Sequence, residues 1–316
     1  MTELQSLSLC ARVTLDLHNL NSEGTEGNQQ QTRMVHVVDS EGRRRNVNAV
    51  SGDMFKHIFV EHLTAGLAAA GQPLSSGARS YDPDRVNVDD AFKAAIKDFK
   101  EGSLVLDEVI RCCAVTDIAG TLITEGRAVA RKSCVEFGWV VGLPGKTHTE
   151  QYFHVKYAPD TRAKSAGQDE RGEGTVAGRQ AIFHRPANSG VYALICHLEL
   201  SRIGVNDITR KLVIDQADRK IRARAAIEAL IATLVKPSGA QRNTQNPHIV
   251  ACEGIVAAST SYLPAPTVSP LGDGYQAQVS QIETVLNRIQ PDSVSTHAFA
   301  DLASGISHLQ TISGQV

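Results

Sequence analysis

The sequence predicts a fold of the α+β or α/β class, and three segments carry this prediction. Residues 7–17 alternate strictly between apolar and polar side chains, which is the period of a strand with one buried face. Residues 51–70 instead repeat apolar side chains at helical spacing. Residues 191–200 form a nearly continuous apolar run, which is typical of a central strand. Strands and helices therefore interleave along the chain, as they do in mixed folds.

Length and composition indicate a folded, soluble protein. The 316 residues suffice for one large domain or two ordinary ones, and 42% hydrophobic residues can form a core, which excludes wholesale disorder. No apolar run approaches the ~18 residues of a membrane span, and no basic segment precedes Arg12, so we expect neither a membrane helix nor a secretory signal. The six cysteines are scattered, mostly within apolar segments, which suits reduced thiols in the cytoplasm.

The N-terminal third predicts a strand, a loop, a second strand and a helix, in that order. A polar loop with two glycines and a run of glutamines follows the first strand over 19–31. A second strand is expected at 34–38, with a tight turn at 39–42. Ser51 is a typical N-cap for a helix that runs to about residue 70. The apolar row of this helix consists of Phe55, Phe59, Leu63 and Leu67, supported by Met54 and Ile58.

The middle of the chain offers fewer core residues. Glycine, proline and serine dominate 71–84, which indicates an insertion or a linker, and a short helix is expected around 89–99. Residues 104–113 and 133–141 are apolar core elements, and the second is expected to be a strand. The segment 142–190 contains one strand-like run and then a polar, glycine-rich stretch. A region of this length usually serves function or is mobile.

The C-terminal third predicts a helix over 215–235, a polar loop to residue 248 and a last strand at 249–258. Three prolines then separate a small-residue, partly helical tail. In the helix we expect one apolar face to be buried and two arginines to lie on the opposite side. The apolar face consists of Ile221, Ile227, Ile231 and Leu234, and the arginines are Arg219 and Arg222.

The sequence does not match the common motifs of catalytic sites or of metal-binding sites. The segment 145–147 (Gly-Lys-Thr) lacks the preceding glycine that a phosphate-binding loop needs, and it precedes a strand-like run rather than a helix. The glycines of 172–178 miss the dinucleotide-binding spacing. No histidine or cysteine pair has zinc-site spacing, so His148 and His154 are expected to be structural. No nucleophile elbow is present, although a triad assembled from distant residues is left open. We therefore expect no catalytic residue, no metal and no cofactor.

Positive charge is concentrated in two parts of the chain. Residues 200–245 carry nine Lys and Arg against four acids, a net of +5, whereas 246–316 have a net of −4. Such segregation is compatible with an anionic ligand and equally with solvated helices. A helix start preceded by small residues suits the binding of a phosphate, and Lys56, one turn into the helix, could reach the same phosphate. The alternative interpretation is a capped helix beside a solvated turn, with no ligand. This second, polar and basic group comprises Asn19, Asn21, Arg43, Arg44, Arg45, Ser51, Gly52, Lys56 and His57.

These same residues carry a resemblance to a known family. The segments 19–21 (Asn-Leu-Asn) and 48–57 (Asn-Ala-Val-Ser-Gly-Asp-Met-Phe-Lys-His) resemble the backbone subunit of CRISPR Cascade complexes, the Cas-seven family, in its DevR-type branch. The resemblance spans about residues 6–260, and the ordered set of blocks, rather than any single block, makes it specific. The further blocks are 131–137, 150–154, 189–194, 202–204 and 238–242.

The resemblance implies an α+β fold with a modified RNA-recognition (ferredoxin-like) palm, a finger insertion and an extended thumb hairpin. The polar face of the first strand offers no aromatic side chain for base stacking, so contacts to the RNA backbone are expected. The palm would be discontinuous within 1–260, with its core in 6–70, 103–141 and 190–260, the fingers in 71–102, the thumb in 142–189, and a partly helical tail in 261–316.

Roles are carried over by position. Lys56 and the helix start at Ser51 and Gly52 match the phosphate-holding helix of the family, and Asn19 and Asn21 match the start of its RNA-facing loop. Gln241 and Arg242 match its polar loop before the last strand, whereas the arginines at 43–45 fit by charge only. The segment 184–188 departs from the acidic and small residues of the family, which leaves the local thumb geometry open. RNA-cleaving relatives use an aspartate in the early loop, where this chain has only Glu23 and Glu26, so a non-catalytic role is implied.

The function so implied is that of a crRNA-binding backbone subunit of a type I CRISPR Cascade surveillance complex, which polymerises along the guide RNA and helps it pair with target DNA. The expected partners are the crRNA guide, the target DNA strand through the guide, further copies of the chain, and the large, guide 5′-end and guide-processing subunits, with no membrane. Two alternatives stay open. One is an RNA-cleaving relative that acts through Glu23 or Glu26, and the other is a DevR-type transcriptional autoregulator, for which no helix-turn-helix signal is seen.

Overall fold

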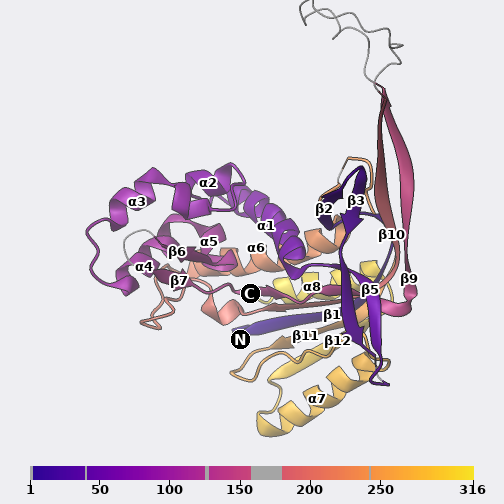
Figure 1. Ribbon diagram of the computed structural model, residues 1–316. Helices are drawn as coiled ribbons and strands as arrows, with labels where there is room; N and C mark the ends of the chain where they lie inside the picture. The colour runs from indigo at the N-terminus through magenta and orange to yellow at the C-terminus, as the bar shows by residue number, and fades with distance from the viewer. Residues whose placement is uncertain (1–2, 40, 125–127, 158–179, 242) are drawn as a thin grey trace, which may run out of the picture.

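The computed structural model describes residues 3–39, 41–124, 128–157, 180–241 and 243–316, which form a mixed fold dominated by an antiparallel sheet (Figure 1). The helices are α1 Gly52–Ala69, α2 Ser76–Arg79, α3 Asp90–Ile96, α4 Gly102–Cys112, α5 Ala114–Ala119, α6 Gln216–Val235, α7 Tyr275–Ile289 and α8 Leu302–Ser313. The strands are β1 Ser6–His18, β2 Ser22–Glu26, β3 Gln29–Thr32, β4 Met34–Val38, β5 Arg44–Val50, β6 Thr121–Ile123, β7 Val129–Arg131, β8 Val135–Phe137, β9 Val140–Tyr157, β10 Gln180–Leu198, β11 His248–Ser259 and β12 Val294–Phe299.

Strand β1 lies in the middle of the main sheet, whose order is β12-β11-β1-β10-β9-β5-β4. Every neighbouring pair along this path is antiparallel. The register places Ala11 of β1 opposite Leu194 of β10 and opposite Gly254 of β11. The strands that the sequence predicts at 7–17 and 34–38 are thus confirmed.

The face of β1 that the sequence predicts to be polar is buried at Ser8 and Cys10 and half-buried from Arg12 to Asp16. The Ser8 hydroxyl donates a hydrogen bond to the carbonyl of Pro266 (2.6 Å), and Cys10 packs in one cluster with Tyr275 of α7. Figure 1 shows α7 on the side of the sheet opposite to α1, α6 and α8. The predicted alternation of apolar and polar side chains is present, but the polar face is not open to solvent at Ser8 and Cys10, because the segment after β11 folds back over it.

Helix α1 has the predicted boundaries and the predicted buried face. The Ser51 hydroxyl accepts a hydrogen bond from the backbone N–H of Met54 (3.2 Å), which satisfies one of the unpaired amides of the first turn. The whole apolar row is buried, and α1 packs against α6, which packs in turn against α8. The buried residues of the row are Phe55, Ile58, Phe59, Leu63 and Leu67.

Helix α6 also has the predicted boundaries, and the predicted face is confirmed in part, because Ile227 and Leu234 are buried and Ile231 is half-buried. Ile221 is 38% exposed, whereas Arg219 and Arg222 are buried, contrary to the sequence prediction. Arg222 Nη1 lies 2.9 Å from Asp117 Oδ2, and Arg219 Nε donates to the carbonyl of Ile203 (3.1 Å). The prediction is wrong because helical periodicity cannot foresee that distant segments supply buried acceptors for these two guanidinium groups.

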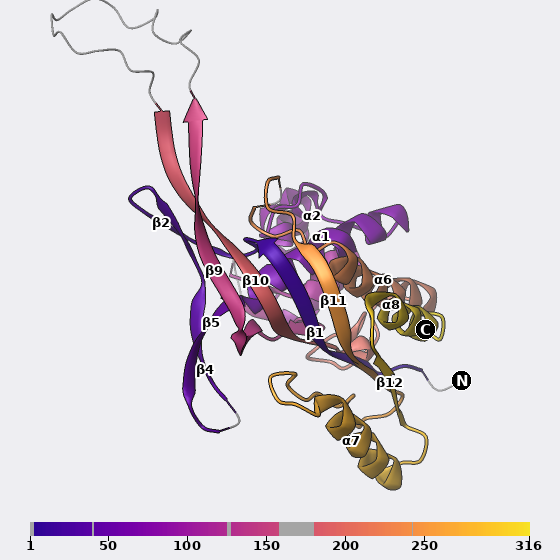
Figure 2. The same ribbon diagram turned by 90° about the vertical axis from the view of Figure 1, so that its right-hand side faces the viewer.

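One segment that the sequence predicts as a loop contains strands, and another contains more strand than the single strand-like run predicted there. The segment 19–31 forms the hairpin β2–β3, and the region after residue 141 forms most of β9 and β10. These two strands run on beyond the sheet as a two-stranded arm (Figure 2), which pairs as far as Tyr157 opposite Gln180. The Gly-Lys-Thr segment at 145–147 lies within β9, and the polar stretch at 158–179 lies outside the described residues.

The segment after residue 261 extends the sheet. Strand β12 pairs with β11, which the sequence predicts to be the last strand, and the register places Val256 opposite His297. Helix α8 packs against α6 and β11, whereas α7 packs against β11 and β12 from the other side. Among the helices of the described part, none is both long and apolar enough to cross a membrane.

Candidate nucleic-acid interface

The start of helix α1 is held by residues from three segments. The backbone N–H and the hydroxyl of Ser51 both donate to Asn21 Oδ1, at 3.3 and 3.0 Å. A Cβ atom on Gly52 would lie 2.5 Å from the carbonyl oxygen of Phe137, so only glycine lets the helix begin this close to β8. The amides of the first turn and the positive end of the helix dipole make this position suitable for an anion.

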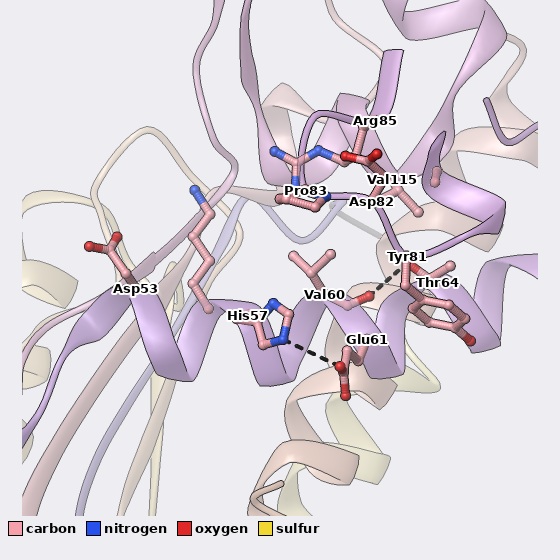
Figure 3. Close-up of a pocket in the computed structure, with 12 residues that line it drawn as sticks. Asp53, His57, Val60, Glu61, Thr64, Tyr81, Asp82, Pro83, Arg85 and Val115 are labelled. Carbon is pink, nitrogen blue, oxygen red and sulfur yellow. Dashed lines mark hydrogen bonds and ion pairs between the residues drawn. The ribbon is translucent and has the colours of Figure 1, made fainter. Parts of the chain in front are cut away.

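Lys56 lies where two clefts meet. One cleft of 240 Å³ separates α1 from the segment around Arg85 (Figure 3), and another of 310 Å³ separates α1 from β8. Burial, and after it the nearby charge of Arg85, lowers the pKa of Lys56 from its ordinary value. His57 is half exposed, and its Nε2 lies 3.3 Å from Glu61 Oε1. Between the described side chains, no ion pair joins Lys56 to a carboxylate, so its ammonium can receive an anionic ligand.

Asn19 and Asn21 do not reach the surface. Both side chains are buried, and Asn19 Nδ2 donates to Gln30 Oε1 on the β2–β3 hairpin (3.4 Å). Asn21 holds Ser51, as described above. The structure therefore gives both residues a supporting position, between the hairpin and the helix start.

Arg43, Arg44 and Arg45 lie apart from Lys56. They are placed at the far end of β5, roughly 20 Å along the strand from Ser51 at 3.3 Å per residue. The guanidinium Nε atoms of Arg43 and Arg45 lie 3.3 and 3.0 Å from Asp39 Oδ2. The backbone N–H of Arg43, and then these two guanidinium groups, lower the pKa of Asp39 to about 2. The three arginines are therefore not brought together with the helix start.

Gln241 lies in the loop that follows α6, next to the β2–β3 hairpin. The backbone N–H of Ala240 donates to the carbonyl of Leu20 (3.1 Å), which fixes this loop against the end of β1. Gln241 and Gln30 both line a cleft of 290 Å³ between the loop, the hairpin and the arm. Arg242, the neighbouring expected residue, lies outside the described residues.

Aromatic and basic side chains gather on the arm beside this cleft. The rings of Phe153 and His184 lie 5.7 Å apart in an edge-to-face arrangement, and the Arg185 guanidinium lies 4.8 Å from the centroid of the Phe183 ring. Phe153 is 59% exposed. Exposed aromatic rings and guanidinium planes are surfaces on which nucleobases stack.

Sequence reasoning missed three further groups near α1. Trp139 is 46% exposed and lines the 310 Å³ cleft, and the Arg33 guanidinium lies 5.4 Å from the centroid of its ring. Arg85 lines the 240 Å³ cleft together with Lys56. Trp139 is the one tryptophan of the chain, which is the only signal that could have singled it out. Arg33 and Arg85 carry no local signal, because only the fold brings their segments to α1.

The acids of the early loop have protein partners. Glu23 forms an ion pair with Arg33, and Glu26 Oε2 accepts a hydrogen bond from Gln31 Nε2 (3.5 Å). Across the described ranges, no group of three or more His, Cys, Asp or Glu side chains is arranged to hold a metal ion. His148 is largely exposed on β9.

Comparison with known proteins identifies similar chains. A family model described as CRISPR-associated negative auto-regulator DevR/Csa2 matches residues 9–280. A chain of a CRISPR RNA-guided surveillance complex, described as pre-nicking, is similar with a TM-score of 0.50 at 14% identity, over 98% of this chain and 99% of that chain. A chain of a CRISPR RNA-guided surveillance complex has a TM-score of 0.47 at 12% identity, over 98% of each chain. Csc2 of Thermofilum pendens has a TM-score of 0.39 at 12% identity, over 100% of this chain and 86% of that chain. No curated protein sequence matches.

Proposed function

We propose, from the premise that this chain belongs to the DevR/Csa2 family of CRISPR-associated proteins, that it is a non-catalytic crRNA-binding backbone subunit of a type I CRISPR surveillance complex. The observation that carries the proposal is the capped start of α1, where Lys56 faces two clefts beside the exposed ring of Trp139. Amides, an ammonium and an aromatic ring recognise phosphates and base faces, which every RNA sequence shares. Such a surface can hold a guide of any sequence.

The covered sheet supports binding through the RNA backbone rather than on a sheet platform. In RNA-recognition folds the bases stack on aromatic residues of an open sheet face. Here α1, α6 and α8 occupy one face, and α7 with the segment before it covers the other at β1 and β11. The surface left for RNA is the edge formed by the α1 start, the β2–β3 hairpin and the arm.

The proposal divides the chain into palm, fingers and thumb. The sheet and α1 would form the palm (6–70, 103–141 and 190–260), and α2 and α3 would belong to a finger insertion (71–102) that leaves the palm at the end of α1. The arm of β9 and β10 supports a thumb within 142–189 because it extends well beyond the sheet (Figure 2). The segment 261–316 contributes β12, so it would be integrated with the palm rather than appended to it.

In this proposal the protein acts in the cytoplasm with several partners. Its own copies would stack head to tail along the crRNA guide, since a heterologous interface that does not close yields an open helical array. The guide would pair with the target DNA strand while bound. The other partners would be the large, guide 5′-end and guide-processing subunits of the complex.

The proposal is tested first at Lys56. We expect Lys56→Ala to weaken binding similarly for guides of different sequence, because a phosphate contact carries no sequence information. The slope of log affinity against log salt should become shallower by roughly 0.7, the value for one phosphate of a single strand. Binding isotherms with single-stranded RNA at several salt concentrations measure both quantities. Lys97→Ala removes an exposed lysine of the insertion and serves as the matched control.

The same preparation tests the two alternatives. An unchanged salt slope for Lys56→Ala would contradict the site, and absence of RNA binding by the wild-type chain would contradict the function. Cleavage of complementary RNA with a divalent metal, lost in Glu23→Gln or Glu26→Gln, would instead establish an RNA-cleaving subunit. Specific binding to duplex DNA of its own promoter, without RNA, would establish an autoregulator, which is the role that the family description names.

A further inference from the structure

Arg85 lines the cleft that it shares with Lys56, and one donor of its guanidinium has no partner among the described residues. Its Nη2 donates to the carbonyl of Gly120 (2.8 Å), whereas its Nε is buried and has no hydrogen-bond partner in the described part of the chain. Figure 3 shows the side chain of Arg85 reaching across the top of the cleft, above Val60 and His57 of α1. The cleft of 240 Å³ is several times the ~30 Å³ share of one water, so it has room for a phosphate group.

The chain holds Arg85 in a conformation that costs free energy. Its φ of +46° lies in the left-handed region, which side chains other than glycine rarely adopt. Helix α2 packs closely against the backbone of the same residue, because a Cβ atom on Gly77 would lie 2.3 Å from the carbonyl oxygen of Arg85. Backbone strain of this kind persists only where the surrounding packing enforces it, and it is concentrated at functional sites. The packing of α2 therefore fixes the position of Arg85 over the cleft.

Among the described side chains, the acids around the cleft form no ion pair with its two cations, and the charges of Asp53 and Glu136 only partly oppose the lowering of the Lys56 pKa. Within the described ranges, neither Lys56 nor Arg85 forms an ion pair with a carboxylate, and one of the acids, Glu61, contacts His57 instead. The two cations repel each other, and the Arg85 charge adds to burial in lowering the pKa of Lys56. The acidic residues that line the cleft are Asp53, Glu61 and Asp82.

We propose that Lys56 and Arg85 together clamp one phosphate of the bound RNA, so that the 71–102 insertion supplies part of the RNA-binding site. This inference rests on the proposed function and extends it to a second element. A phosphate between the two groups would remove their repulsion and would accept a hydrogen bond from the Arg85 guanidinium. The guanidinium supplies directed donors and the ammonium supplies a point charge, a combination that suits a phosphodiester.

The test is a double-mutant cycle with Arg85→Gln and Lys56→Gln, in which an unstructured oligouridine RNA is the probe and Arg79→Gln is the matched control. Arg79 is an exposed arginine of the same insertion and does not line the cleft. We expect each single variant to lose roughly tenfold in affinity, which corresponds to one charge-assisted hydrogen bond. If both cations hold one phosphate, the double variant should lose less than the product of the two losses, and its salt slope should fall by only about 0.7.

Each outcome has a distinct meaning. Arg85→Gln binding RNA as well as Arg79→Gln would overturn the inference, while a loss in Lys56→Gln alone would leave the proposed function standing. Independent, multiplicative losses would overturn the shared phosphate. Arg85→Lys keeps the positive charge but lacks the planar, forked set of guanidinium donors. Compared with Arg85→Gln, it should therefore regain most of the salt dependence of binding but only part of the RNA affinity. If Arg85→Gln lowered the unfolding midpoint of the RNA-free chain and left RNA affinity unchanged, the residue would be a packing element and the inference would be wrong.

Discussion

Two arginines are buried against one carboxylate in the interior. Arg131 Nη2 lies 2.6 Å from Asp117 Oδ1, and Arg222 Nη1 lies 2.9 Å from Asp117 Oδ2, with all three side chains at most 1% exposed. Both guanidinium groups also donate to backbone carbonyls, among them that of Val205 from Arg131 and that of Ile110 from Arg222. Burial of these charges is tolerated because each is paired and hydrogen-bonded. The cluster ties α5, β7 and α6 together.

The cluster makes stability sensitive to Asp117. We expect Asp117→Asn to lower the free energy of unfolding by about 3–5 kcal/mol, because the buried Arg222 loses its carboxylate partner and Arg131 keeps only that of Asp207 (3.0 Å). Urea denaturation of the RNA-free chain measures this change. Asp98→Asn, at an exposed position, should change stability by less than about 0.5 kcal/mol. A loss for Asp117→Asn as small as that of the control would show that the network contributes little net stability.

His18 makes stability depend on pH. Its ring is fully buried against Tyr192, at 5.1 Å between ring centroids, and burial lowers its pKa from 6.5 to about 4. Between these two values the unfolded chain binds the proton and the folded chain does not. The free energy of unfolding should therefore fall as the pH is lowered from 6.5 to about 4, by up to roughly 3 kcal/mol from this group. Denaturation curves at several pH values measure the trend.

The matched variants for this pH dependence are His18→Gln and His148→Gln. The first removes the buried imidazole, so the difference between wild type and variant should shrink as the pH falls below 6.5. The second removes a histidine whose side chain is 75% exposed and should leave the pH dependence unchanged. Parallel curves for wild type and His18→Gln over this range would contradict the assignment.

At the scale of one element, α1 contains two glycines whose substitution by alanine should have opposite effects on stability. A Cβ atom on Gly52 would lie 2.5 Å from the Phe137 carbonyl oxygen, whereas Gly66 is exposed and has open space around it. We expect Gly52→Ala to destabilise by about 1–3 kcal/mol and to weaken RNA binding, because the helix start must move away from β8. Gly66→Ala should stabilise by about 0.5–1 kcal/mol through helix propensity and leave RNA binding unchanged. Equal effects of the two substitutions on RNA binding would contradict a role for the helix start.

At the scale of the whole molecule, a change at the tip of the arm should affect assembly without affecting folding. The register ends with Tyr157 opposite Gln180, so a two-residue Asn-Gly turn can replace 158–179 and close the hairpin. We expect this variant to keep the unfolding midpoint of the wild-type chain, since the replaced segment lies beyond the paired arm. If the arm acts as the proposed thumb, the variant should bind RNA weakly and fail to form regular assemblies, because it could no longer contact a neighbouring subunit.

Electron microscopy of the variant with guide RNA provides the measurement. A second variant that replaces 158–179 with a glycine-serine linker of equal length separates reach from side-chain chemistry. Regularly spaced, full-length complexes formed by the Asn-Gly variant would show that the region beyond the paired arm is dispensable, and the thumb proposal would then be wrong.

The sequence by itself determined those elements whose signals are local. Strand β1, helix α1 with its Ser51 cap and the bounds of α6 follow from periodicity and capping, which act within a few residues. Local signals also predict the part of the candidate site that lies on one element, the start of α1 from Ser51 to Lys56. Local sequence signals do not predict the burial or the contacts of a residue whose partners are distant in the chain.

Only the tertiary structure decided which faces are buried and which cations share a cleft. Arg222 of α6 is buried because it pairs with Asp117, which lies 105 residues before it in the chain. The second face of β1 is partly covered by a segment more than 250 residues later. Arg85 and Lys56 line one cleft because the fold brings the segment after α2 against α1. Burial of a polar group depends on whether some segment supplies a partner, and contact between distant segments leaves no periodic trace in either one.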